Sequence, residues 1–302
     1  MSGTVFLVNP AAENGAVGRR WPELAQRAAK LGLTGDALLS ERPGHLTELA
    51  RSVAADGASL LVAVGGDGTV NEVVNGIEGA SGIELAVLPN GTGWDFVRTY
   101  EIPRRFEDAV AVARDGAVRT IDLGRAFYRA RDGSAAETYF ANIASAGMSG
   151  AIAERANRTT KALGARLSYL WATFAVFSRW RNCDVTVTVD GKTHSGPMHD
   201  VVVANGRYFG GGMMICPEAR PDDALFDVLL IGDLTKRDLM LTLPKTYRGK
   251  HLPHPKAELL SGAEVTVEAE RPLPVQLDGE QPGTTPARFA VVPGALRLRV
   301  PS

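Results

Sequence analysis

The stretch AVGGDGTVNEVVNG, residues 63–76, constrains the fold of this chain more than any other. Three glycines surround Asp67 directly after an apolar run that predicts a buried strand. The residues that follow have the spacing of one helical face: Val70, Val73, Val74 and Ile77. The stretch therefore predicts a strand, a tight glycine turn with positive φ, and a helix. A purely structural turn is the simplest alternative.

A glycine turn between a strand and a helix also suits an anion, because the first amides of the helix point toward it. Asp67 is unusual there, since a carboxylate repels phosphate unless a divalent cation or a proton transfer is involved. The segment LPNGTGWDFVR (88–98) repeats the arrangement, and NPAAENG (9–15) supplies a third polar loop after a strand. Strands of a parallel sheet end at one edge, so the three loops predict a nucleotide site.

The pattern of predicted strands and helices changes near residue 125. Before it, predicted strands such as 4–8 and 37–40 alternate with helical patterns such as 21–31, which indicates an α/β domain with a parallel sheet. After it, strands dominate, with a hairpin at Asp190-Gly191. A helical stretch over roughly 150–180 interrupts them; its apolar residues are Leu163, Leu167, Tyr169, Leu170, Trp171, Phe174 and Phe177. We expect an α/β domain over 1–125 and a mainly-β sandwich domain over 126–302, whose extreme C-terminus returns to the first domain.

Composition excludes several classes of protein. The net charge of −1 provides no field to attract nucleic acid, so no nucleic-acid partner is expected. Two cysteines without CxxC spacing indicate buried thiols in a reducing compartment. No apolar run approaches the roughly 20 residues of a membrane span, and the first residues resemble a strand more than a signal peptide. These features predict a cytoplasmic protein.

Two nucleotide motifs are incomplete. DGKT at 190–193 resembles the end of a Walker A loop, but the first glycine of that motif would fall on Thr186. Gly66 and Gly68 begin a GxGxxG pattern whose third glycine position is Asn71. A Walker ATPase and a Rossmann dehydrogenase are therefore disfavoured.

Six segments together resemble the diacylglycerol kinase catalytic family, which includes sphingosine kinases and bacterial lipid kinases. They are VNPAAENG, SERPGHLTELA, VAVGGDGTVNEVVNG, LPNGTGWDFVR, PEARPDDALFDV and QLDGE, in the family's order over residues 8–280. GGDGT alone is shared with NAD kinases, whereas LDGE and DDALFDV favour the lipid kinases. The resemblance implies an α/β nucleotide domain, a β-sandwich domain and an active site in the cleft between them.

The resemblance also implies cofactors and their ligands. ATP would be surrounded by Asn9, Pro10, Ala11, Ala12, Glu13, Ser40, Gly66, Asp67, Gly68, Thr69, Val70, Asn71, Glu72 and Thr92. Asp67 would hold the catalytic Mg²⁺ or its waters. A structural Mg²⁺ would be bound by Asp223 with main-chain carbonyls near Arg220 and Leu225, an all-oxygen environment that suits a hard cation.

In QLDGE, Asp278 and Glu280 would form the acidic catalytic pair, with Glu280 as proton acceptor for the lipid hydroxyl. Both carboxylates would lie on one side if the segment is extended. Which of the two is the base stays open, and a solvated acidic turn is the alternative. The family commonly has Asn where this chain has Trp94 and Gly where it has Ala224, while Ser40 replaces a common Thr. Trp94 puts the identity of the acceptor in doubt.

The expected activity is therefore ATP- and Mg²⁺-dependent transfer of the γ-phosphoryl group to a lipid hydroxyl, of diacylglycerol or a related lipid. A kinase of a soluble, NAD-like acceptor and a non-catalytic nucleotide-binding regulator are the alternatives. A lipid substrate implies transient, peripheral contact with the inner membrane surface, for which basic pairs such as Arg104-Arg105 or Arg179-Arg181 are candidates. The sequence leaves the oligomeric state open, a homodimer included.

Overall fold

The structure is a computed structural model that describes residues 3–91, 93–158, 173 and 175–302. The chain divides into two compact units: Met1–Ile121 with Gly294–Ser302, and Asp122–Pro293. Strands β5 (Ala117–Ala130) and β16 (Glu280–Val300) each begin in one unit and end in the other. The first unit therefore ends four residues before the expected boundary, and the last residues of the chain belong to it.

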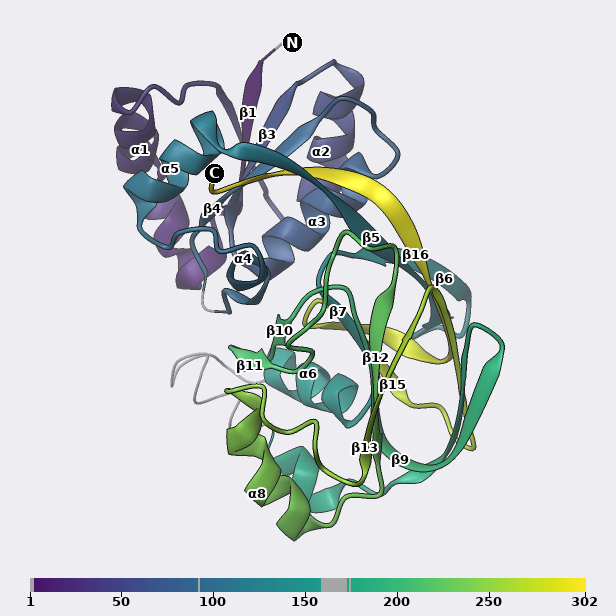
Figure 1. The fold of residues 1–302 in the computed structure, drawn as a ribbon. Helices are drawn as coiled ribbons and strands as arrows, with labels where there is room; N and C mark the ends of the chain where they lie inside the picture. Colours follow the sequence, from purple (N-terminus) through teal and green to yellow (C-terminus); the bar gives the residue numbers. More distant parts are fainter. Residues whose placement is uncertain (1–2, 92, 159–172, 174) are drawn as a thin grey trace. The chain divides into compact units, whose positions relative to one another are not determined.

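The first unit is built on a parallel sheet (Figure 1). Its strands are β1 (Thr4–Val8), β2 (Asp36–Leu39), β3 (Leu60–Gly65) and β4 (Glu84–Pro89), joined in the order β2-β1-β3-β4. The end of β16 adds a further parallel strand beside β4, with Arg297 opposite Glu84. β3 and β4 are almost wholly buried, which explains why they read as continuous apolar runs. The predicted parallel α/β architecture is confirmed.

Helices cover this sheet: α1 (Ala12–Lys30), α2 (His45–Ala55), α3 (Asp67–Ile77), α4 (Asp95–Thr99) and α5 (Phe106–Asp115). The predicted one-face residues of α3 are all buried: Val70, Val73, Val74 and Ile77. The prediction of a first helix at 21–31 was too short, because α1 begins at Ala12. Glu13, Asn14 and Gly15 have left-handed φ values, which interrupt the helix near its start. The apolar spacing in the sequence therefore did not indicate a start at Ala12.

The second unit is mainly β and has its own apolar core. Its strands are β6 (Ala135–Phe140), β7 (Ile143–Gly147), β8 (Cys183–Val189), β9 (Lys192–Ala204), β12 (Phe226–Gly232), β13 (Ala257–Gly262), β14 (Glu264–Ala269) and β15 (Pro274–Leu277). The first half of β9 pairs with β8, whereas its second half lies between β7 and β12. One strand thus joins the two layers of a sandwich, and Phe226, Phe289 and Phe140 pack between them. A short pair, β10 (Tyr208–Phe209) and β11 (Met213–Met214), lies apart from this sheet.

The predicted hairpin at Asp190-Gly191 is confirmed, with φ of 44° and 80° at the two turn residues. Two helices of this unit are α6 (Met148–Arg158) and α8 (Lys236–Thr246). Most apolar residues of the helical stretch expected at 150–180 lie outside the described residues; Phe177 is described and packs beside Met148 and Ile152. Within the described part of the chain, no helix is long and apolar enough to cross a membrane.

Candidate functional site

The two glycine segments of the first unit meet backbone to backbone. Asn90 N donates to Gly65 O at 2.8 Å, and a Cβ on Gly91 would lie only 2.5 Å from Gly66 Cα. The glycines are required by this close approach. The prediction of positive φ in the turn was wrong: Gly66 has φ of −102°, and neither Gly65 nor Gly68 adopts a left-handed conformation.

The first turn of α3 is open to a ligand. Its N-cap residue, Gly66, provides no side-chain cap, and a Cβ on Gly68 would meet no atom within 4 Å. Thr69 N and Val70 N both donate to Gly66 O, which fixes the turn. An exposed helix start with an uncovered backbone is where a phosphate group can approach closely. The arrangement fits the predicted role of this loop.

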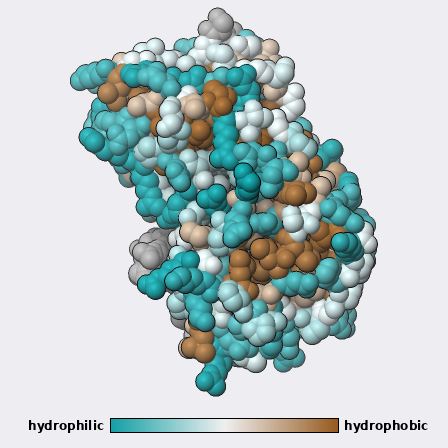
Figure 2. Space-filling model, viewed as in Figure 1, coloured by the Kyte–Doolittle hydropathy of each residue, from teal (hydrophilic) through white to brown (hydrophobic). Residues whose placement is uncertain are grey.

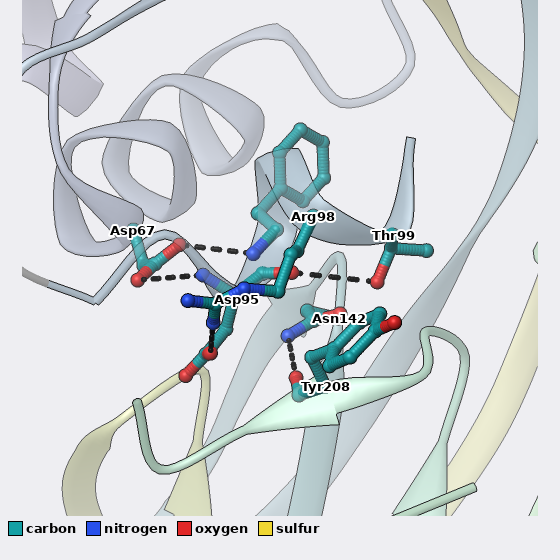
Figure 3. Close-up of polar contacts among 7 residues, drawn as sticks. Asp67, Asp95, Arg98, Thr99, Asn142 and Tyr208 are labelled. Atoms are coloured by element: carbon teal, nitrogen blue, oxygen red, sulfur yellow. Dashed lines mark hydrogen bonds and ion pairs between the residues drawn. The ribbon is translucent and has the colours of Figure 1, made fainter. Parts of the chain in front are cut away.

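Asp67 holds the second glycine segment in place (Figure 3). Its Oδ1 accepts a hydrogen bond from Phe96 N at 3.0 Å and its Oδ2 one from Asp95 N at 3.4 Å. Burial raises the pKa of Asp67, and these two amides and the nearby Arg98 guanidinium oppose the rise. Asp67 therefore ties the start of α4 to the start of α3, and its carboxylate is the group that would hold a magnesium ion here.

The loop after β1 joins the same cluster. Asn9 Nδ2 donates to Thr69 Oγ1 at 3.1 Å, and Asn9 Oδ1 accepts from Ala11 N at 3.0 Å. Glu13 lies 3.5 Å from Arg20 in an ion pair at the far end of this loop. Asn9 thus brings the loop at Pro10–Ala12 and the glycine turn together, as the sequence predicted for three loops at one sheet edge.

Several other residues that were predicted to surround ATP make contacts within the protein itself. Glu72 Oε2 accepts from Leu46 N at 3.1 Å and so caps α2, while its carbonyl accepts from Thr47 Oγ1. The side chain of Val70 is buried in the core. Ser40 follows β2, and its amide donates to Val8 O. Thr92 lies outside the described residues. Asn71 lies in α3, where its carbonyl accepts from the Asn75 side chain.

The two departures from the family pattern share a backbone conformation. Trp94 has φ of 63° and Ala224 has φ of 61°, both left-handed. Asn and Gly, the residues that the family commonly places there, tolerate this conformation better than Trp or Ala, for which it costs about 1 kcal/mol or more. The Trp94 ring is covered by the Arg104 guanidinium at 5.1 Å. Trp94 also borders a small hollow beside Gly66 and Asp67.

In the second unit, the QLDGE segment is a hairpin and not an extended strand. Asp278 and Gly279 have φ of 47° and 95°, and Leu277 pairs with Glu280 across the turn. The condition under which both carboxylates would lie on one side, an extended segment, is therefore not met. Asp-Gly is the dipeptide that such two-residue turns favour, because both positions need positive φ.

Asp278 turns inward, toward the connection between β6 and β7. Its Oδ1 accepts from Asn142 N at 3.0 Å and from Ile143 N at 2.9 Å, and its Oδ2 accepts from Ala141 N at 2.8 Å. Asn142 in turn donates through its side chain to Tyr208 O at 2.6 Å (Figure 3). Glu280, two residues later, is exposed at the start of β16. Asp278 is thus half-buried and hydrogen-bonded to backbone amides, whereas Glu280 is an exposed residue.

At the predicted structural metal position, Asp223 and the residues beside it interact with other acidic side chains. Asp223 Oδ1 accepts from Leu225 N at 3.1 Å, and the buried Asp122 accepts from Ala224 N at 2.8 Å. Burial raises the pKa of Asp227, as do the charges of Asp223 and Glu218. The Oδ2 atom of Asp227 is buried without a hydrogen-bond partner among the described residues. Sequence reasoning missed Asp122, although a lone Asp in the apolar run TIDLG was the available signal.

No three His, Cys, Asp or Glu side chains gather as metal ligands in the described part of the chain. The predicted set, one carboxylate with main-chain carbonyls near Arg220 and Leu225, is of another kind. A cation there would relieve the repulsion between Asp223 and Asp227, so the residues fit the ion.

We expect Asp223→Ala to remove most of the Mg²⁺-dependent rise in melting temperature, because a bound cation stabilises only the folded chain. The melting temperature is measured with and without Mg²⁺ for the wild type, Asp223→Ala and the neighbouring exposed control Asp222→Ala. An equal response to Mg²⁺ in wild type and Asp223→Ala would contradict this assignment.

A network of buried, hydrogen-bonded polar side chains lies in the second unit, at the start of α6. Ser149 N and Oγ donate to Asp200 at 3.0 and 2.9 Å, and Ser149 Oγ lies 2.6 Å from Ser145 Oγ. Ser145 Oγ donates to Gln276 Oε1 at 3.0 Å. Burial raises the pKa of Asp200 to about 7, against hydrogen bonds from Ser149 and Val201 that lower it.

Asp200 predicts a pH dependence of stability. Its folded pKa lies above that of the unfolded chain, about 3.9, so folded Asp200 keeps its proton while the unfolded chain releases it. Stability is therefore lost as the pH rises from about 4 to about 7, at up to about 1.4 kcal/mol for each pH unit. Asp200→Asn stays neutral, and its amide can donate to Ser149 Oγ.

We expect Asp200→Asn to unfold at higher denaturant than the wild type at pH 8, with the difference shrinking toward pH 5. Urea unfolding at both pH values measures it, with the exposed Asp36→Asn as control. A difference that does not change with pH would rule out this titration.

Comparisons with known proteins agree with the two-unit structure. Residues 3–126 match the diacylglycerol kinase catalytic domain, and residues 142–300 match the YegS C-terminal NAD kinase beta sandwich-like domain. A diacylglycerol kinase of Mycobacterium tuberculosis is 28% identical over 299 residues, which cover 98% of this chain and 94% of that protein.

Two solved structures show the same fold. A proposed diacylglycerol kinase from Bacillus anthracis aligns with a TM-score of 0.78 and 23% identity, covering 99% of this chain and 95% of that one. Yeast NADH kinase, in complex with NADH, aligns with a TM-score of 0.53 and 11% identity, covering 100% of this chain and 84% of the yeast chain. Both structures thus share the fold of this chain, its mainly-β second unit included.

Proposed function

This chain belongs to the diacylglycerol kinase catalytic family and is a phosphotransferase with an alcohol group as acceptor, and we propose that it transfers the γ-phosphoryl group of ATP to diacylglycerol or a related lipid. The observation that carries the nucleotide part is the uncapped start of α3 with open space above Gly68. The lipid part is supported by the relatives' names and by the LDGE and DDALFDV segments.

The residues of the first unit bind and orient the nucleotide in this proposal. The amides at the start of α3 receive the phosphates, and Asn9 fixes the turn through Thr69. Asp67 positions the second glycine segment and holds Mg²⁺ or its waters. When bound, Mg²⁺ supplies positive charge that neutralises the triphosphate.

In the second unit we assign Glu280 as the proton acceptor for the lipid hydroxyl. Its exposure lets it reach a substrate, whereas the three amide hydrogen bonds to Asp278 suit a residue that positions the turn. We therefore move Asp278 from the catalytic pair to a positioning role. Phosphoryl transfer needs little further covalent help, because positioning and charge neutralisation dominate it.

A soluble acceptor is the second candidate, favoured by the likeness to yeast NADH kinase. Phosphate transfer from γ-³²P-ATP into diacylglycerol, sphingosine, phosphatidylglycerol and NAD tests both, in Mg²⁺ buffer with and without chelator. Labelling of diacylglycerol alone, abolished by chelator, is the expected result. Labelling of NAD would favour the second candidate, and binding of ATP without transfer to any acceptor would favour a nucleotide-binding regulator.

A further inference from the structure

Helix α8 of the second unit turns its apolar side chains outward. Met240 is 69% exposed, Leu241 60% and Tyr247, just after the helix, 42%. The buried positions are instead Thr242 and Thr246. Figure 2 shows a small apolar area, bordered by hydrophilic residues, at the place that α8 occupies in Figure 1. An exposed apolar surface of this kind marks a place where a protein meets a partner.

The helix is held firmly in this orientation. Thr235 and Asp238 form a capping box, in which Asp238 N donates to Thr235 Oγ1 at 3.1 Å and Thr235 N donates to Asp238 Oδ2 at 3.0 Å. On the inner side, Leu239 packs against the buried cluster of Met148 and Ile152. The outward direction of Met240 and Leu241 is therefore set by a capped and anchored helix.

Positive charge surrounds these apolar residues. Residues 236–250 contain five basic side chains, Lys236, Arg237, Lys245, Arg248 and Lys250, and a single acidic one, Asp238. Lys236 Nζ donates to Ser178 O at 3.0 Å, which places α8 beside a segment that carries Arg179 and Arg181. That segment borders a hollow of about 520 Å³ whose lining includes Arg271 as a third guanidinium.

We propose that α8 and the turn after it, residues 236–250, dock this protein on a bilayer that contains anionic lipids. Apolar side chains enter the interface, while the flanking Lys and Arg attract acidic headgroups. A second copy fits less well, because a symmetric contact would bring the same five basic side chains against themselves. The inference rests on the proposed lipid acceptor, which lies in a bilayer.

Vesicle sedimentation without ATP tests the docking separately from catalysis. The probe is phosphatidylcholine vesicles with and without about one third phosphatidylglycerol, and the wild type should bind only the second kind strongly. Met240→Ser with Leu241→Ser should weaken binding at least about tenfold, because two exposed apolar groups no longer enter the interface. Vesicle binding should also weaken about fivefold for each positive charge removed by Lys245→Gln, Arg248→Gln and Lys250→Gln.

The matched control is Val118→Ser with Leu259→Ser, two other side chains that are each 40% exposed. It should bind vesicles like the wild type. Wild-type binding by the α8 double variant, or no vesicle binding by the wild type, would overturn the proposal. So would sedimentation velocity that shows a dimer broken by the α8 variant while vesicle binding is unchanged.

Turnover of a short-chain, water-soluble diacylglycerol separates docking from the proposed function. The α8 double variant should lose turnover on vesicle-embedded diacylglycerol and keep it on the soluble form. A wild type that binds anionic vesicles but phosphorylates neither form would refute the acceptor and leave the docking surface standing.

Discussion

Glu280→Gln should lower kcat with a lipid acceptor by about 10² to 10⁴, the range that a lost general base costs. The substitution keeps the shape of the side chain and removes only its capacity to take a proton. Because Glu280 is exposed at the start of β16, the stability should change by less than about 0.5 kcal/mol. ATP affinity should be unchanged, since no proton transfer is needed to bind the nucleotide.

Asp278→Asn separates the two carboxylates. One oxygen that accepts backbone hydrogen bonds becomes an NH₂ group facing an amide donor, which costs about 1–3 kcal/mol of stability. Its turnover should fall through a displaced turn, in step with its melting temperature. Glu280→Gln should lose turnover at a normal melting temperature.

The measurements are kcat, ATP affinity by calorimetry and melting temperature, with the exposed Glu268→Gln of β14 as a charge-matched control. Near-normal turnover in Glu280→Gln would refute the base assignment and make Asp67 the next candidate. If both single variants lose turnover at full stability, the pair acts as a unit, and the double variant should then lose less than the product of the two losses.

The sequence predicted the first unit well because its signals are local. Buried parallel strands read as apolar runs, and α3 shows its buried face in the spacing of Val70, Val73 and Ile77. The conformation inside the glycine turn was not predictable in this way. Gly66 and Gly91 are glycines because two backbones meet, and that contact joins segments 25 residues apart along the chain.

The tasks of individual carboxylates were the least predictable feature. Glu72 and Asp278 both belong to motifs, yet one caps α2 and the other holds the β6–β7 connection. Asp190, in the other Asp-Gly hairpin, accepts from Ala263 N and Glu264 N in the same manner. Such partners are fixed by tertiary packing, so a motif gives the residue without its hydrogen bonds. The outward Met240 of α8 likewise has no signal in its own helical periodicity.

Gly68→Val should weaken ATP binding by about 10- to 100-fold, which corresponds to the loss of one or two hydrogen bonds to a charged phosphate. The valine side chain would fill the space above the first turn of α3, where a Cβ now meets nothing within 4 Å. That same openness means that the fold tolerates the change. Gly68 has no left-handed φ, and valine is a better helix former than glycine, so the melting temperature should hold or rise.

A substitution at Gly91 should damage the fold, unlike the one at Gly68, and it therefore serves as a comparison. A Cβ on Gly91 would lie 2.5 Å from Gly66 Cα, so Gly91→Ala should lower stability and ATP affinity together. Gly3→Val, another open position without positive φ, should change neither. Calorimetric ATP titration and thermal unfolding of the three variants separate a blocked phosphate site from a damaged fold. Unchanged ATP affinity in a stable Gly68→Val protein would place the nucleotide elsewhere and remove the main support for the proposed kinase site.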